Sequence, residues 1–214
     1  MADSFWSLLS AGIQFTVPLA ILSFILGLAV GVIVALLRLY GPKPLKWFCD
    51  FYVWVIRGTP LLVQLFLIFY GLPNAGITLD AFPAALIGFT LNVGAYTSEI
   101  VRGAILSVPK GQWNAAYSLG MNGAQAIRWV IVPQSVFVSL PPLSNTFISL
   151  IKDTSLAAVI TVPEMFLAAQ RIVSVTYEPL ILYVEAALIY LLFSTFLGKI
   201  QVRLEKYYQR HTVH

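Results

Sequence analysis

Charged side chains are scarce in this sequence, and a few of them interrupt long apolar runs. Glu99 lies within the apolar run 83–105, while Lys152 and Asp153 directly follow the run 126–151. A charged side chain at the centre of a bilayer costs about 2.5–3.5 kcal/mol on insertion scales, so such a residue is a functional candidate by default. A carboxylate suits the ammonium group of a ligand, and neighbouring opposite charges suit a zwitterion. We therefore expect Glu99, Lys152 and Asp153 to bind a small polar substrate.

Each of these charges also has a purely structural explanation. Glu99 lies three residues before Arg102, so the two can form an ion pair on one helical face. Lys152 and Asp153 can mark the outer end of an apolar helix and extend to water. Adjacent helical residues point about 100° apart, so both can bind one ligand only where the backbone is irregular. The turn-prone Thr154 that follows favours such irregularity, and the alternatives stay open.

Uncharged polar residues in the apolar runs form a second set of candidates. Asn92 lies seven residues before Glu99, on the same helical face. Ser149 likewise lies four residues before Asp153. Interhelical hydrogen bonds explain most residues of this kind without a ligand. We select Asn92 and Ser149 as further substrate-binding candidates, and we expect Glu185, in the last apolar run, to pack against a basic residue of another helix.

The composition requires a membrane around most of the chain. Of 214 residues, 59% are hydrophobic and only 10% are charged, whereas a soluble domain carries roughly 25% charged residues. A helix needs roughly 20 apolar residues to span a bilayer. The sequence therefore predicts an all-α integral membrane protein, with a single domain over 1–214 and five transmembrane helices. These spans are expected at about 11–37, 52–72, 83–105, 126–151 and 179–198, with a re-entrant or interfacial piece at 152–178.

The basic residues predict the orientation of these spans. Eleven of the thirteen Lys and Arg residues flank the loops on one side of the membrane. By the positive-inside rule that side is the cytoplasm, so the amino terminus is outside and the carboxyl terminus is cytoplasmic. The eleven residues are Arg38, Lys43, Lys46, Arg57, Arg102, Lys110, Arg128, Lys199, Arg203, Lys206 and Arg210. Lys152 and Arg171 lie on the other side.

The loop 107–124, on the predicted cytoplasmic side, has the pattern of a short surface helix. Trp113 and Tyr117 are four residues apart and share a face. Gly120 suits the position just beyond a helix end, and with Ala116 it leaves a shallow notch. The pattern fits either an interfacial helix anchored by its aromatic residues or an element that docks into a partner protein.

This loop resembles the EAA loop of bacterial ABC importer permeases. That motif has Glu-Ala-Ala, three residues, Gly, nine residues, and then an aliphatic residue with Leu-Pro. The matching positions, with the same spacing, are Asn114-Ala115-Ala116, Gly120 and Val130-Ile131-Val132-Pro133. Asn114 replaces the usual Glu, which removes a charge, and Val132 replaces Leu. The resemblance implies a coupling helix that docks into an ATPase subunit through Gln112, Trp113, Asn114, Ala115, Ala116 and Gly120.

Further motifs extend the resemblance over roughly residues 10–205. Arg57-Gly58-Thr59-Pro60 is similar to the RGTP signature of the polar amino acid permease branch. YGLP at 70–73, SLIKDTSLAA at 149–158 and VPEMF at 162–166 are most similar to L-cystine permeases. The chain is thus identified as a member of the polar amino acid ABC permeases, of the histidine, glutamine and cystine type.

The resemblance implies an importer made of several subunits in the bacterial inner membrane. A second permease, identical or related, completes the pathway, two copies of an ATPase lie beneath it, and an extracytoplasmic solute-binding protein delivers a polar amino acid such as L-cystine. The sequence has no Walker-type phosphate-binding motif. We therefore expect ATP and Mg²⁺ in the partner ATPase, and neither a cofactor nor enzyme activity in this chain.

Other functions also fit a membrane protein of this size. An ion-gradient-driven secondary amino acid transporter would use an intramembrane carboxylate as its ion site, but it predicts inverted repeats, which the sequence does not show. An intramembrane enzyme or scaffold is the other alternative, and HExxH and GxSxG motifs are missing. One cysteine and two histidines give no metal site, and the scattered basic residues do not favour nucleic acid.

Overall fold

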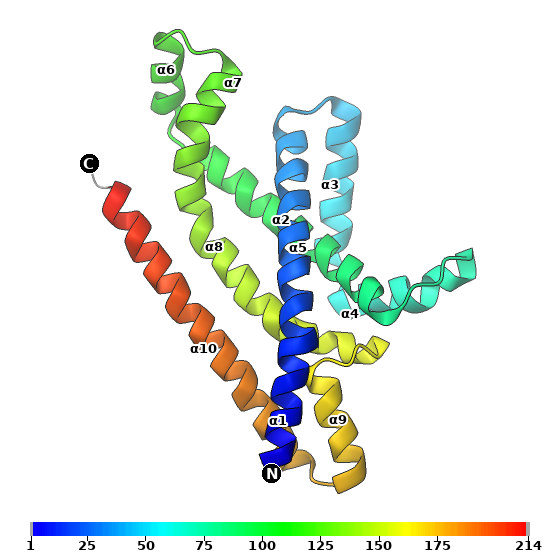
Figure 1. Cartoon of the computed structure of the whole chain (residues 1–214). Helices are drawn as coiled ribbons and strands as arrows, with labels where there is room; N and C mark the ends of the chain where they lie inside the picture. The colour runs from blue at the N-terminus through cyan, green and yellow to red at the C-terminus, as the bar shows by residue number, and fades with distance from the viewer. Residues whose placement is uncertain (1, 213–214) are drawn as a thin grey trace.

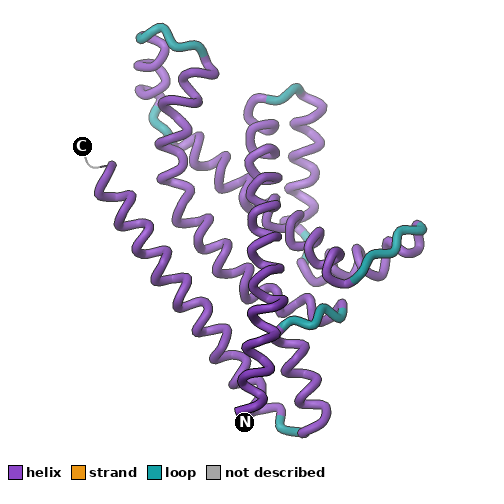
Figure 2. The backbone as a smooth tube through the Cα atoms, in the orientation of Figure 1, coloured by secondary structure: helices purple, strands orange, loops and turns teal. Residues whose placement is uncertain are grey.

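The computed structural model describes residues 2–212, with side chains from residue 4 to residue 206, and this part of the chain consists of helices and short connections (Figure 2). Arg210, counted above for the orientation, lies outside the described side chains. The helices are α1 (Ala2–Ala11), α2 (Val17–Tyr40), α3 (Lys43–Gly58), α4 (Leu61–Phe66), α5 (Ala81–Ser107), α6 (Lys110–Ser118), α7 (Gly123–Ala126), α8 (Val132–Asp153), α9 (Met165–Thr176) and α10 (Pro179–Thr212).

The helices provide up to five membrane crossings. In the described part of the chain, four continuous helical stretches are long and apolar enough to span a bilayer: Ser4–Tyr40, Ala81–Ser107, Gly123–Ile160 and Pro179–Lys206. A fifth crossing needs the pair Lys43–Gly58 and Leu61–Ala75, which is bent by 108°. In Figure 1 the amino terminus and α9 lie at one end, while α6, the α2–α3 turn and the end of α10 lie toward the other. The two termini thus lie toward opposite ends, as an odd number of crossings requires.

The second expected span, 52–72, is not one helix. α3 begins nine residues earlier than predicted, at Lys43, and ends at Gly58. Thr59 is extended, with φ −120° and ψ 147°, and α4 starts after Pro60. The proline ring disfavours helical backbone at the preceding residue, so Thr59 leaves the helix. The expectation of one continuous span over 52–72 did not take this effect of Pro60 on Thr59 into account.

The Gln64 side chain satisfies the backbone at this break. Its amide nitrogen donates to the Ile56 carbonyl at 2.7 Å and lies 3.1 Å from the Thr59 carbonyl. These carbonyls lack the intrahelical partners that a continuous helix would supply. Gln64 is buried, and unpaired backbone at this depth is tolerated only where protein or a water-filled cavity surrounds it.

Helices α2 and α5 form the closest packed pair. A Cβ added to Gly27 would lie 2.6 Å from the Val93 side chain, and one added to Gly31 would lie 2.6 Å from Thr97. Small residues spaced four apart let two backbones approach in this way. Gly27 and Gly31 therefore serve packing between α2 and α5 within the chain.

Within residues 2–212, three π-helical segments, each with a widened turn, interrupt the regular helices. They are Gly12–Thr16, Leu67–Gly71 and Ile127–Ile131. Each ends two residues before a proline, namely Pro18, Pro73 and Pro133. A proline in a helix removes one hydrogen bond and presses on the carbonyl four residues earlier. A widened turn relieves that contact without ending the helix.

The remaining predicted spans are shorter than the observed helices. The first, 11–37, lies within a helical stretch that reaches Tyr40, and the last, 179–198, lies within α10. α5 covers the third span, and the helical stretch Gly123–Ile160, which includes α8, covers the fourth, with Pro141 and Pro142 inside α8. Residues 152–178 contain a 3-10 segment (Thr154–Ile160) and the short apolar helix α9.

Candidate substrate pathway and coupling helix

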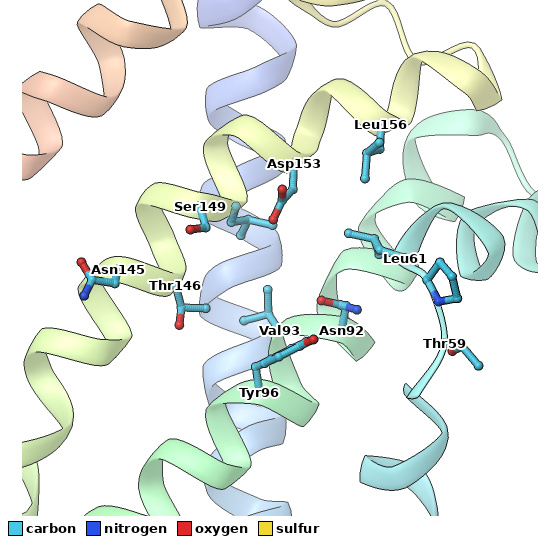
Figure 3. A pocket seen from close by; sticks show the side chains of 12 residues that line it. Thr59, Leu61, Asn92, Val93, Tyr96, Asn145, Thr146, Ser149, Asp153 and Leu156 are labelled. Carbon is cyan, nitrogen blue, oxygen red and sulfur yellow. The ribbon is translucent and has the colours of Figure 1, made fainter. Parts of the chain in front are cut away.

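A cavity of about 490 Å³ lies between the α3–α4 break, α5 and α8 (Figure 3). Polar and apolar side chains face it from these three elements and from the 3-10 segment that follows α8. α3 and α4 meet at its edge, where Thr59, Pro60 and Leu61 contribute to the wall. The other lining residues are Asn92, Val93, Tyr96, Asn145, Thr146, Ser149, Leu150, Asp153 and Leu156.

Three predicted substrate residues meet at this cavity. Ser149 and Asp153 face it from α8, and Asn92 faces it from α5 (Figure 3). The amide nitrogen of Asn92 donates to Oε1 of Gln64 at 3.2 Å, which fixes the orientation of the amide. Its carbonyl oxygen and second N–H can then bind a ligand. The cavity thus combines a carboxylate with neutral hydrogen-bonding groups.

Lys152 lines a different cavity. That space, of about 500 Å³, lies beside α10 and is also lined by Ser155 and Tyr190. The backbone stays helical past Asp153, because a 3-10 segment begins at Thr154. The irregular backbone that would let Lys152 and Asp153 bind one ligand is therefore missing at this point, and the two side chains line different cavities.

Glu99 is the centre of an ion-pair network. Its Oε2 accepts from Arg102 at 2.7 Å and 3.1 Å, the pair expected from the sequence as a structural alternative. Its Oε1 also accepts from Arg38 at 2.8 Å, and Arg38 donates to Asp50 at 2.6 Å. Arg57 approaches the same Oε1 at 3.6 Å. Glu99 does not line the cavity of Asp153; it lines another of about 430 Å³, beside Arg57.

Glu164 is a buried carboxylate that our sequence analysis did not single out. It is 0% exposed and is the N-cap residue of α9, where it accepts from the backbone N–H groups of Phe166 and Leu167 at 2.8 Å and 2.7 Å. Tyr190 of α10 donates to it at 2.8 Å. An acidic residue at the start of an amphipathic run is favoured by the positive end of the helix dipole, and this signal could have identified Glu164.

α6 forms the predicted short helix in the loop 107–124. Trp113 and Tyr117 lie on one face, with ring centroids 6.3 Å apart. Gly120 follows the helix with φ +79°, and the N–H of Met121 donates to the Ala116 carbonyl at 3.1 Å. This left-handed residue and its hydrogen bond are typical of a glycine helix end.

Two of the residues expected to contact a partner, Trp113 and Ala116, lie on the inner face of α6. Ala116 is only 2% exposed, and Trp113 packs against the cluster of Ile105, Val108 and Ile131. These two residues therefore attach α6 to its own chain, so Ala116 does not form an open notch. Other α6 residues remain exposed and available to a partner: Gln112, Asn114, Ala115 and Tyr117.

The family comparison establishes the class of this protein. Residues 27–209 match the family described as binding-protein-dependent transport system inner membrane component. The chain belongs to this family. As the sequence predicted, its relatives are permease subunits of amino acid ABC transporters, which are not enzymes themselves.

Two curated relatives cover nearly the whole permease. The L-cystine transport system permease protein TcyB of Bacillus subtilis is 54% identical over 98% of this chain and 90% of its own length. The glutamine transport system permease protein GlnP of Escherichia coli K12 is 37% identical, with coverage of 93% and 92%.

Solved structures show the same fold. A crystal structure of an amino acid ABC transporter with histidines has a TM-score of 0.92 at 37% identity and covers 96% of both chains. The inward-facing methionine transporter MetNI has a TM-score of 0.71 at 17% identity, covering 96% of this chain and 94% of its own, and supports the fold alone.

This permease is therefore a multi-pass inner-membrane subunit of an amino acid ABC transporter. Membership of the family implies an ATPase subunit, a second permease and a solute-binding protein as partners. It also favours ATP-driven transport over the ion-gradient alternative.

Proposed function

We propose that this permease moves L-cystine into the cytoplasm, with Asp153, Asn92 and Ser149 as its substrate-binding residues. The observation that carries the proposal is the meeting of these three side chains at one cavity between α5 and α8. The Asp153 carboxylate binds an ammonium group of the substrate. Asn92 and Ser149 add neutral hydrogen bonds that orient it. The 54% identity to an L-cystine permease supports this choice of amino acid.

α6 is the contact with the ATPase in this proposal. Its residues Gln112, Asn114 and Ala115 are exposed, and Trp113 and Ala116 attach the helix to its own chain. Gly120 ends the helix and sets its direction. A movement of the ATPase is thereby passed to α5 and α8, the two helices that carry the binding residues.

The assembly has two permease chains, which are copies or relatives, over two ATPase subunits. ATP and Mg²⁺ bind to the ATPase subunits, and the permease itself carries no cofactor. α6, the α2–α3 turn and the end of α10 face the cytoplasm, and the amino terminus faces outside. The placement of α6 and the α2–α3 turn at one end supports this orientation (Figure 1). Closure of the ATPases turns the cavity from outward-facing to inward-facing, a two-state transition biased by ligand and nucleotide.

Uptake in proteoliposomes tests the proposed function. The complete complex, with its ATPase and solute-binding protein, should take up labelled L-cystine with ATP inside and no ion gradient. Asp153→Asn should lower uptake far more than assembly, and Asp80→Asn is a matched control, because Asp80 lies outside the cavity at the start of α5. Normal uptake by Asp153→Asn would exclude Asp153 as a substrate residue. Failure of L-cystine to stimulate ATP hydrolysis, while another amino acid does so, would exclude L-cystine.

A further inference from the structure

A second cavity follows the first along α5. It has a volume of about 430 Å³ and is lined by residues of α2, α3 and α5, among them Arg57, Gly58 and Glu99. Tyr96 lines both cavities. Glu99 lies seven residues beyond Asn92 in the direction of α6, which corresponds to about 10 Å along the helix axis. The second cavity therefore lies on the α6 side of the first.

The ion-pair network beside the second cavity carries a net positive charge, although the charges that line the cavity itself, Arg38 and Arg57 with Asp50 and Glu99, balance. Three arginines, Arg38, Arg57 and Arg102, meet two carboxylates, Asp50 and Glu99, which leaves a formal charge of +1. Glu99 is already saturated by Arg38 and Arg102, with hydrogen bonds on both of its oxygens. It therefore has little capacity left to bind a substrate ammonium.

Arg57 is the arginine with unused donors. Its nearest contact with Glu99 is 3.6 Å, beyond ordinary hydrogen-bond distance. Within the described residues it makes no hydrogen bond; its guanidinium lies over the Tyr96 ring at 5.3 Å, and 43% of its side chain is exposed. By contrast, Arg38 is 12% exposed and donates to both carboxylates. A guanidinium with a free planar edge matches the two oxygens of a carboxylate.

We propose that the cavity beside Arg57 is a second substrate station, which binds the carboxylate of the amino acid after it leaves Asp153. The inference rests on the proposed function and adds a site to it. The two stations have complementary charge: a carboxylate that binds the ammonium group in the first, and a guanidinium that binds the carboxylate in the second. Tyr96 lines both cavities, so the substrate passes this side chain when it moves from the first station to the second.

Binding to the permease–ATPase complex in nanodiscs tests this station. The solute-binding protein is left out, because it has its own preference for amino acids. The probes are labelled L-cystine and its dimethyl ester, which keeps the ammonium groups but has no charged carboxylates. The wild-type complex should prefer L-cystine by roughly tenfold or more, the size expected for hydrogen bonds to charged groups. Arg57→Gln should remove most of this preference.

Arg102→Gln is the matched control. It removes the same charge from the network, but Arg102 lines neither cavity, so this variant should keep the preference. The proposal would be overturned if Arg57→Gln kept the preference for L-cystine over the ester, or if Arg102→Gln lost this preference to the same extent. Should Arg57→Gln not assemble, Arg57→Lys keeps the charge without the planar guanidinium; its preference should fall, and an unchanged preference would overturn the proposal.

The result also separates this station from the proposed function. If the complex takes up L-cystine in proteoliposomes but binds the free acid and the ester equally, only the proposed Arg57 station is disproved. If the complex takes up no L-cystine, both the proposed substrate and the Arg57 station are disproved.

Discussion

The Tyr190 hydroxyl donates a hydrogen bond to Glu164 at 2.8 Å and joins the middle of α10 to the start of α9. The two residues lie 26 positions apart in the chain, on either side of the turn at residue 177. Burial raises the pKa of the Glu164 carboxyl, and the hydrogen bonds from Phe166, Leu167 and Tyr190 lower it. Burial is the larger effect, and the resulting pKa is about 7. This contact should therefore make the stability of the fold depend on pH.

Stability should fall as the pH rises through 7. The folded protein holds the Glu164 proton more tightly than the unfolded chain, whose ordinary pKa is 4.5. The contribution is fully present below pH 4.5 and is lost through pH 7, a change of about 3 kcal/mol in the free energy of unfolding. Thermal unfolding of the purified complex at several pH values measures it. Glu164→Gln should flatten the dependence, and an unchanged slope would contradict the prediction.

Gly31→Ala should separate α2 from α5. The added Cβ would lie 2.6 Å from Thr97 and 3.0 Å from the Gly94 carbonyl oxygen. Overpacking of this kind costs about 1–3 kcal/mol, so the unfolding temperature in detergent should drop. Gly198→Ala is the control, because a Cβ at Gly198 meets nothing within 4 Å. Equal unfolding temperatures for the two variants would show that the helices tolerate wider spacing.

Gln64→Ala should destabilise the α3–α4 break. The substitution leaves the Ile56 and Thr59 carbonyls without their side-chain donor and frees the Asn92 amide. A buried polar group without a partner costs about 1–3 kcal/mol. Thermal unfolding should show this loss, together with weaker L-cystine binding. Gln134→Ala, which loses hydrogen bonds to the Val130 carbonyl and to Oε1 of Gln112, lies outside the cavity and should have a smaller effect on stability and none on binding.

Gly120→Val should uncouple transport from ATP hydrolysis. A side chain at φ +79° costs about 1–2 kcal/mol, and more with a β-branched residue. The end of α6 should therefore change direction while the spans stay inserted. Substrate-stimulated ATP hydrolysis and uptake measure the coupling. Gly123→Ala, at a site without positive φ and with open space, should remain coupled; normal uptake by Gly120→Val would argue against α6 as the coupling element.

Much of the fold follows from hydropathy, because apolar length alone locates the spans. The exception is instructive: 52–72 is apolar enough for one helix, yet the pair Thr59-Pro60 ends α3 within it. Hydropathy averages over a window and does not detect a backbone restriction at one residue. The dipeptide itself was visible in the sequence and predicts the break.

The candidate site was predictable only within single helices. The i and i+4 spacing of Ser149 and Asp153 places both on one face, and the i and i+3 spacing of Glu99 and Arg102 gives their ion pair. Contacts between helices could not be obtained in this way. Arg38 reaches Glu99 across 61 positions, and only the packing of α2 on α5 brings them together.

The non-helical residue at the α3–α4 junction gives this permease a pivot. α3 lies along α2 and contacts α5 near Tyr52, whereas α4 packs beside α5 at the edge of the cavity. A change of angle at Thr59 leaves the hydrogen bonds within each segment intact but disturbs those that Gln64 of α4 donates to the Ile56 and Thr59 carbonyls. The angle between the two segments, and with it the wall of the first cavity, is therefore held by the Gln64 side chain rather than by a continuous helix.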